Sequence, residues 1–326
     1  AKRRERREGR GGEGEQRGVA RGEGSEVRSA PRRGVMTVEG VTAVTPSGET
    51  LRVREVWEDN LEEEMKIIRD CIDEFPFVAM DTEFPGVVAR PVGNFKNSSE
   101  YHYQTLRVNV DMLKLIQLGL TLSDKDGKLP RHNEEICVWQ FNFREFEVEN
   151  DIHSGESIEL LRTSGIDFEN MEKRGIDVHH FGELLMCSGV VLNDKVNWVT
   201  FHCAYDFGYL MKVLTCKALP ETESDFFEVF NVFFPRVFDM KYMSKFCNGL
   251  HGGLNKIAEV MKVDRIGPMH QAGSDSLLTL DTFMRMVKLH FNNNLENIEK
   301  HCTVLYGLGS DASTGTQENG FTEATL

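Results

Sequence analysis

The sequence has no long apolar run and no paired cysteines. No uninterrupted apolar stretch approaches the ~18 residues that a membrane-spanning helix needs. No two cysteines form a Cys-x-x-Cys pair, which argues against a zinc or redox motif of that kind. The amino terminus also lacks the apolar core of a secretory signal. We therefore expect a soluble globular protein of the cytoplasm, with access to the nucleus. The seven cysteines stand at positions 71, 137, 187, 203, 216, 247 and 302.

Basic charge is also scarce. The 326 residues include 38 Lys and Arg against 52 Asp and Glu, which gives a formal net charge of −14. Residues 1–35 carry +5 of this total, so that residues 36–326 carry −19. Sequence-independent nucleic-acid binding normally draws on a basic surface. The acidic body argues against a broad duplex-binding surface, but it allows a narrow site in which metal ions supply the positive charge.

Residues 1–35 differ in composition from the rest of the chain. They are rich in Arg, Glu and Gly, with almost no large apolar side chain, so we predict a disordered tail. Their Arg-Gly pattern is typical of RNA-binding tails, but Met36 also looks like a natural start, which would make the upstream residues irrelevant to the fold. We expect one domain over residues 36–309, because α/β folds often use about 200 to 250 residues or more as one unit. A second disordered tail is expected at 310–326.

The residue pattern alternates between strands and helices. Asn60 as the cap, with Glu63 three residues later and apolar residues at helical spacing after it, predicts a helix start. This helix leads into the apolar run at 75–80. Residues 113–122 and 136–143 predict an antiparallel pair of strands beside that run, with a turn at 124–127. Further helices are expected at 157–163, 176–188, 205–214, 224–234, 254–261 and 271–289, and short strands at 196–201 and 237–239.

The apolar run ends in Asp81-Thr82-Glu83. Residues i and i+2 of a strand point to the same side, so Asp81 and Glu83 could offer their oxygens jointly to a hard divalent cation. A solvated strand end is the alternative interpretation of this pair. The same spelling occurs at Asp167-Phe168-Glu169, but it follows a polar, glycine-containing stretch and lacks this context.

Two other junctions carry acidic residues. The strand at 196–201 runs into Asp206, which could ligate a metal or could cap the next helix. His270 precedes Asp275 by five residues at the start of an apolar helix. Asp275 could bind metal while His270 acts as general base. Without the other motifs, His270 would be taken as a surface loop residue. Taken together, four carboxylates and a histidine suit phosphodiester hydrolysis with two divalent ions.

Three segments resemble the exonuclease motifs of the DEDD superfamily, in its histidine-bearing branch: residues 81–86 (DTEFPG), 201–210 (FHCAYDFGYL) and 270–275 (HQAGSD). The segments between them narrow the resemblance to the Caf/Pop deadenylase subunit of the Ccr-Not complex. The resemblance covers about residues 50–309. The narrowing segments are 139–143 (WQFNF), 157–161 (SIELL), 183–189 (ELLMCSG) and 305–309 (LYGLG).

The resemblance implies a ribonuclease-H-like α/β fold, with a mixed sheet flanked by helices. It implies a 3′–5′ exoribonuclease that shortens the poly(A) tails of messenger RNA and releases 5′-AMP. Asp81, Glu83, Asp206 and Asp275 would bind two divalent ions, usually Mg or Mn, and His270 would be the general base. The implied partners are poly(A) RNA, a Ccr-Not scaffold subunit and a second deadenylase subunit.

Two other functions remain open. Another exonuclease of the superfamily, acting on structured RNA or on DNA, fits the three motifs equally well. An interaction subunit whose nuclease site has become secondary is the second alternative. Tyr101 and Tyr103 could stack on RNA bases, but aromatic residues at helical spacing usually fill a core, so we leave them out of the site.

Overall fold

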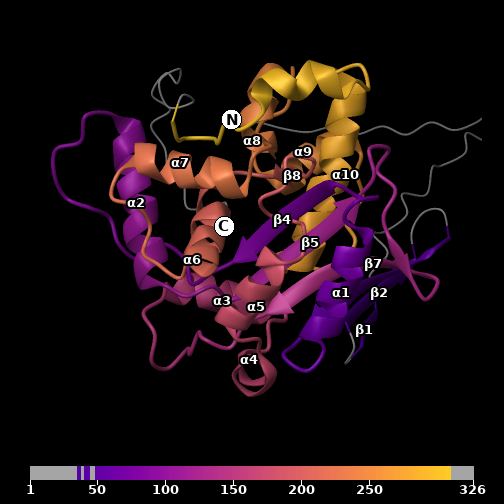
Figure 1. Cartoon of the computed structure of the whole chain (residues 1–326), viewed down its shortest axis with the longest axis horizontal. Coiled ribbons are helices and arrows are strands. Elements are labelled where there is room, and N and C mark those ends of the chain that lie inside the picture. The colour runs from indigo at the N-terminus through magenta and orange to yellow at the C-terminus, as the bar shows by residue number, and fades with distance from the viewer. Residues whose placement is uncertain (1–34, 38–39, 45–47, 310–326) are drawn as a thin grey trace, which may run out of the picture. The chain divides into compact units, whose positions relative to one another are not determined.

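The computed structural model describes residues 35–37, 40–44 and 48–309 (Figure 1). The predicted tails lie outside these residues, apart from Val35. Within the described part, nine strands form one mixed sheet in the order β1-β2-β3-β7-β5-β4-β8-β9, with β6 paired to β7. The predicted mixed α/β class is confirmed. The strands are β1 (Val35–Thr37), β2 (Gly40–Val44), β3 (Thr50–Val56), β4 (Phe77–Glu83), β5 (Gln117–Ser123), β6 (Arg131–His132), β7 (Glu135–Asn142), β8 (Asn197–Thr200) and β9 (Val237–Asp239).

Helices lie on both faces of the sheet. Among the described residues, no helix combines the length and the apolar character that crossing a membrane requires. The α-helices are α1 (Leu61–Cys71), α2 (Ser98–Met112), α3 (Gly155–Thr163), α4 (Phe168–Arg174), α5 (Val178–Met186), α6 (Ala204–Thr215), α7 (Glu223–Phe233), α8 (Met240–Met243), α9 (Leu254–Met261) and α10 (Ala272–His290). Two 3-10 helices are η1 (Ser244–Phe246) and η2 (Leu295–His301).

The predicted strand pair is confirmed, because β5 and β7 are antiparallel and β5 also pairs antiparallel with β4. The predicted turn forms between them, with the Gly127 amide donating to the Asp124 carbonyl. The predicted cap of α1 is wrong in one detail. Asn60 precedes the helix, but its side chain caps none of the helix amides. Its side chain instead accepts from the Trp57 amide and donates to the Glu55 carbonyl, which fixes the turn between β3 and α1.

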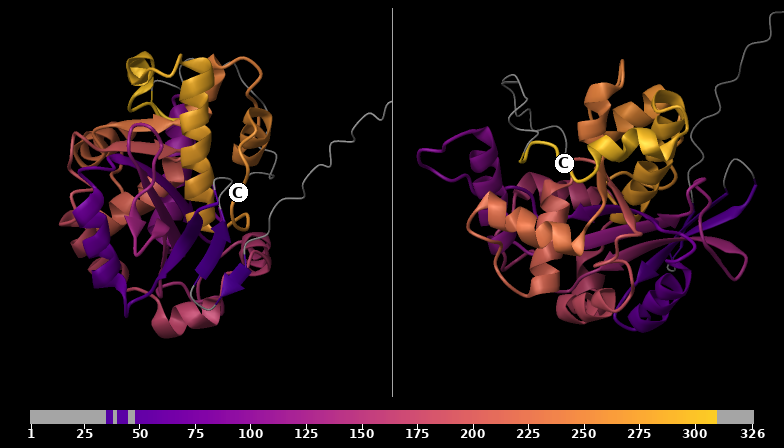
Figure 2. Two further views of the ribbon diagram at one scale, coloured as in Figure 1. Left: turned by 90° about the vertical axis from the view of Figure 1, so that its right-hand side faces the viewer. Right: turned by 45° about the horizontal axis from the view of Figure 1, so that its top comes forward.

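The side-chain alternation along β4 separates two cores. Phe77 and Ala79 pack in a cluster with residues of α9 and α10. Val78 and Met80 point the other way, into a larger cluster with residues of α1, α2, α5, α6 and α7. Helix α10 therefore covers one face of the sheet, and α1, α5 and α6 cover the other (Figures 1 and 2). Each later residue of β4 therefore points either to the α10 face of the sheet or to the opposite face.

A buried ion pair ties α1 to the sheet. Glu64, 4% exposed, accepts two hydrogen bonds from the Arg54 guanidinium, both at 2.7 Å, and one from the Trp139 indole at 3.0 Å. Both carboxylate oxygens are thereby satisfied, as a buried charge requires. The predicted core role of Tyr103 is also confirmed, since its fully buried ring donates its hydroxyl to the Pro220 carbonyl.

Candidate active site

The end of β4 extends past its neighbour β8. The two strands pair in parallel only as far as Ala79 and Val199. Beyond Thr200 the chain turns through His202, whose φ is 60°, and α6 begins at Ala204. The last residues of β4 therefore have no strand on that side. The first turn of α6 lies there instead, which brings Asp206 to the end of β4 that carries Asp81 and Glu83.

The two faces of β4 meet different helices at this end. Asp81 and Glu83 are in phase with Phe77 and Ala79, so they face α10. Thr82 points to the opposite face, where its hydroxyl donates to Asp206 at 2.6 Å. Asp206 is the third residue of α6, so the alternative in which it precedes the helix as its cap is not adopted.

The backbone of α10 lies directly on β5 beside Asp81. Gly119 is the strand partner of Asp81, and a side chain on Gly119 would occupy the position of the Ala272 carbonyl. A side chain on Gly273 would meet Gln140 at 2.9 Å. Glycine at both positions lets the first turn of the helix approach the sheet closely. Asp275, in that turn, thereby comes to the same edge as Asp81.

Amide side chains of the sheet hold this helix end. Gln117 accepts from the Ala272 amide and Gln140 accepts from the Gly273 amide, both at 2.9 Å. These are amides of a helix start, which have no partner within the helix. Glu55 accepts in turn from Gln140 at 2.8 Å, and burial raises the pKa of its carboxyl. The start of α10 is therefore anchored through two layers of hydrogen bonds.

His270 turns back over the start of α10. Its backbone is left-handed, with a φ of 60°, and its amide donates to Asp275 Oδ2 at 2.9 Å. One ligand atom from each of Glu83, His270 and Asp275 lies within 4.8 Å of the others. This spacing suits donors that share one ion or its bound water. The alternative of an isolated loop histidine is not adopted.

Burial raises the pKa of three carboxyl groups of the cluster, those of Asp81, Glu83 and Asp206. Burial raises the pKa of Asp81 and of Glu83 well above the usual range, and the charges of Asp275 and Asp206 raise both further. Burial also raises the pKa of Asp206 to about 6, against the hydrogen bond from Thr82. Groups packed in this way resist ionising together unless a cation joins them. The donor set therefore fits hard divalent ions, which prefer carboxylate oxygens.

One cation of the chain already opposes this repulsion. Arg265 Nη2 lies 2.5 Å from Asp275 Oδ1, and the guanidinium charge lowers the pKa of Asp81 and Glu83. Arg265 could not be predicted from the sequence, because the loop that holds it has no periodic pattern. Gly119 was also missed, although a glycine inside the apolar strand 117–123 is a signal of close backbone approach.

The second Asp-x-Glu sequence forms no site. Asp167 caps α4 by accepting from the Asn170 amide at 3.0 Å, and both Asp167 and Glu169 are exposed. Helix capping accounts for that aspartate. An Asp-x-Glu sequence therefore indicates a site only where it ends an apolar strand.

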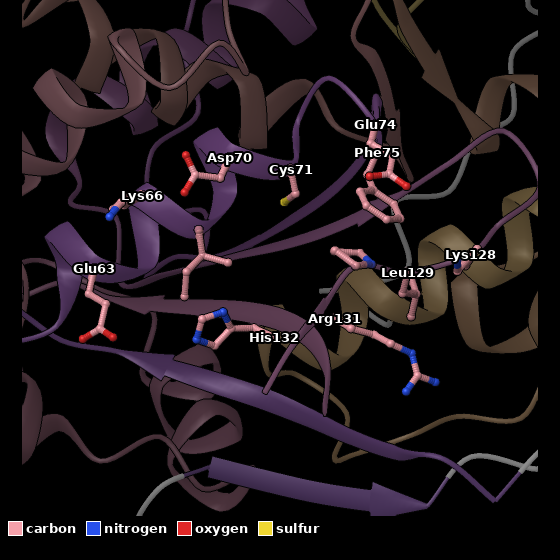
Figure 3. A pocket seen from close by; sticks show the side chains of 12 residues that line it. Glu63, Lys66, Asp70, Cys71, Glu74, Phe75, Lys128, Leu129, Arg131 and His132 are labelled. Carbon is pink, nitrogen blue, oxygen red and sulfur yellow. The ribbon is translucent and has the colours of Figure 1, made fainter. Parts of the chain in front are cut away.

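A pocket of about 510 Å³ lies between α1 and residues 128–132, which include β6 (Figure 3). Phe75, which precedes β4, contributes to its wall, so the pocket lies near the opposite end of that strand from Glu83. It shares no residue with the acidic cluster. Its lining comprises Glu63, Lys66, Ile67, Asp70, Cys71, Glu74, Phe75, Lys128, Leu129, Pro130, Arg131 and His132.

Comparisons of the sequence find a family and its members. The family model described as CAF1 family ribonuclease matches residues 56–183 and 178–283. The chain is 60% identical over 263 residues to "Probable CCR4-associated factor 1 homolog 7" of Arabidopsis thaliana, covering 80% of this chain and 94% of that protein. It is 47% identical over 270 residues to "Poly(A) ribonuclease pop2" of Schizosaccharomyces pombe, covering 83% and 79%.

Solved structures give the same picture. The S. pombe Pop2p structure in its Mg²⁺ and Mn²⁺ bound form superposes with a TM-score of 0.75 at 47% identity, covering 78% of this chain and 99% of the other. The yeast NOT1 MIF4G domain co-crystallized with CAF1 gives a match with a TM-score of 0.64 at 36% identity, covering 78% and 96%. The predicted ribonuclease-H-like fold is thereby confirmed.

Proposed function

The chain belongs to the CAF1 family of ribonucleases, and from this premise we propose that it is a poly(A)-specific 3′–5′ exoribonuclease. It shortens the poly(A) tails of messenger RNA and releases 5′-AMP. The observation that carries the proposal is the buried acidic cluster with His270 at its edge, placed at the end of β4 in a member of this family. The S. pombe relative named a poly(A) ribonuclease supports the choice of substrate.

Asp81, Glu83, Asp206 and Asp275 would hold two divalent ions, Mg or Mn, as the ions of the S. pombe Pop2p structure suggest. When bound, such ions supply Lewis-acid stabilisation of charge on the reacting phosphate and make water a better nucleophile. The carboxylates contribute the negative charge and hard oxygens that retain the ions. Thr82 and Arg265 hold two of these carboxylates, Asp206 and Asp275, in place.

His270 is the proposed general base. A ring nitrogen of His270 can take the proton of the attacking water, because a neutral imidazole has one nitrogen that accepts a proton. Its ligand atom lies within 4.8 Å of those of Glu83 and Asp275, so the proton acceptor and the carboxylates serve one reaction centre. The hydrogen bond from the His270 amide to Asp275 keeps the left-handed turn that aims the ring at this centre.

The chain would act within the Ccr-Not complex. The solved complex of a yeast CAF1 with the NOT1 MIF4G domain supports binding to the scaffold subunit, and the name of the Arabidopsis relative supports association with a second, CCR4-type nuclease subunit. Poly(A) RNA is the substrate, and the cytoplasm and the nucleus are the proposed locations. We keep residues 36–309 as one catalytic domain.

Incubation with a 5′-labelled RNA that ends in adenosines tests the proposal. In Mg²⁺ or Mn²⁺ the label is expected to shift stepwise to shorter products, with 5′-AMP released, and EDTA is expected to stop the reaction. Asp81→Asn should abolish shortening, whereas Glu169→Gln, in the exposed second Asp-x-Glu, should leave it unchanged. Persistence of full-length RNA under conditions in which a known deadenylase is active would contradict the proposal.

A further inference from the structure

Arg265 reaches the acidic cluster from the loop between α9 and α10. Its Nη2 lies 2.5 Å from Asp275 Oδ1, and the two side chains keep only 17% and 11% of their exposure. Water and salt screen such a pair less than a pair on the open surface. The guanidinium charge therefore acts on the cluster at close range.

All five N–H groups of Arg265 have a protein partner. Nε and Nη2 donate to Asn255 Oδ1 at 3.0 and 2.7 Å. Nη1 reaches the Pro268 carbonyl at 3.2 Å and Ser274 Oγ at 3.3 Å, and Nη2 also reaches Asp275. A guanidinium has five donors, so none is left over for a substrate phosphate. Its contacts thus direct the charge at Asp275 rather than at RNA.

Asp275 is engaged at both oxygens. Arg265 contacts Oδ1, and the His270 amide donates to Oδ2. In the described part of the chain, the carboxylates of Asp81 and Glu83 have no such partner, because no hydrogen bond or ion pair joins them to another side chain. Asp275 is therefore paired directly with a cation before any ion binds, whereas the guanidinium acts on Asp81 and Glu83 only through space.

We propose that Arg265 sets the divalent-ion affinity of the cluster: its charge, clamped on Asp275, weakens ion binding and keeps the ion exchangeable. This inference rests on the proposed function only in that the cluster binds divalent ions. Arg265 acts through Asp275, so it is a positioning residue and not a catalytic one.

Removing the guanidinium has two opposing effects. Loss of its positive charge favours a cation in the cluster, whereas loss of the clamp frees the short Asp275 side chain. Charges a few ångströms apart that solvent screens only weakly have an interaction energy larger than the rotamer entropy cost of ordering one short side chain. The charge effect should therefore dominate, and ion binding should become tighter.

Titration of the full chain with Mn²⁺, without RNA, tests this by calorimetry and by the electron paramagnetic resonance of free Mn²⁺. Arg265→Gln should bind Mn²⁺ at least about threefold more tightly than the wild type. Arg265→Lys, which keeps the charge, should stay close to the wild type. The matched control is Arg236→Gln. Arg236 pairs with Glu299 and with Asn197 at the amino-terminal ends of β8 and β9, away from the acidic cluster. It should leave Mn²⁺ affinity unchanged.

Thermal unfolding gives a second readout. A ligand that binds the native state raises the melting temperature more when it binds more tightly, so Mn²⁺ should raise the melting temperature of Arg265→Gln more than that of the wild type. If Arg265→Gln does not fold, Asn255→Asp replaces it: a carboxylate on Nε and Nη2 neutralises the guanidinium in place and should also tighten Mn²⁺ binding.

Unchanged or weaker Mn²⁺ binding by the folded Arg265→Gln or Asn255→Asp protein would overturn the inference. The RNA-shortening assay is separate. A protein that shows the predicted Mn²⁺ affinities but shortens no poly(A) would contradict the proposed function alone. An active deadenylase whose Mn²⁺ affinity is unchanged by these substitutions would contradict the inference alone.

Discussion

The hydroxyl of Thr82 donates a hydrogen bond of 2.6 Å to the carboxylate of Asp206. Thr82 is 6% exposed and Asp206 is 9% exposed, so water offers little replacement for this bond. Thr82 is the middle residue of the Asp-Thr-Glu sequence, and it points away from the two carboxylates on either side of it. The bond ties the end of β4 to the first turn of α6, on the face of the sheet opposite α10.

Thr82→Val keeps the shape of the side chain and removes this donor. We expect at least about a tenfold loss of turnover or of Mn²⁺ affinity, the usual effect of losing a group that orients a metal ligand. Thr82→Ser, which keeps the hydroxyl, should retain most of both. Steady-state kinetics and Mn²⁺ titration of the two variants make the comparison. Equal activity of Thr82→Val and wild type would mean that the bond does not orient Asp206.

His270→Ala removes the proposed proton acceptor. The maximal rate of RNA shortening should fall by about 10²- to 10⁴-fold, as for other general bases, while the affinity for RNA changes little. Single-turnover kinetics measures the chemical step, and fluorescence anisotropy in Ca²⁺ measures binding. A loss that appeared wholly in RNA affinity would assign His270 to substrate binding instead.

Gly119→Ala places a methyl group where the Ala272 carbonyl lies. Because the backbone of α10 would have to move, we expect a loss of unfolding free energy of about 3 kcal/mol or more, together with loss of activity. Chemical denaturation measures the first effect. Gly155→Ala is the matched control, since a side chain there meets nothing within 4 Å. Similar stability of the two variants would show that α10 does not rest on Gly119.

The stability of the fold should depend on pH through the carboxyl group of Asp281, in α10. Burial raises the pKa of its carboxyl to about 6, above the value of about 3.9 in an unfolded chain. Its ionised form therefore destabilises the fold, and this penalty grows between about pH 4 and pH 6 and is complete above. Asp281→Asn should raise the melting temperature at pH 8 and leave it unchanged near pH 4. The control is Asp73→Asn, at an exposed residue, which should have no such effect. If Asp281→Asn raised the melting temperature equally at every pH, burial of the charge would be excluded as the cause.

The sequence alone predicted the parts of the site that follow from local rules. Asp81 and Glu83 could be assigned to one side because strand side chains alternate, and the strand Val237–Asp239 and the helix Leu254–Met261 have the predicted bounds. Contacts between distant segments could not be predicted in this way. The parallel pairing of β3 with β7 and the ion pair of Arg265 with Asp275 depend on the tertiary arrangement, and neither leaves a periodic signal in the sequence.

We expect this acidic cluster to degrade poly(A) with divalent ions. The most direct measurement compares oligo(A), oligo(U) and oligo(dA) of equal length, each with and without EDTA, on the full chain. We predict that oligo(A) is shortened fastest from its 3′ end, and that EDTA stops all shortening. Equal rates on the three substrates would contradict the poly(A) specificity, and shortening that persists in EDTA would contradict the role given to Asp81, Glu83, Asp206 and Asp275.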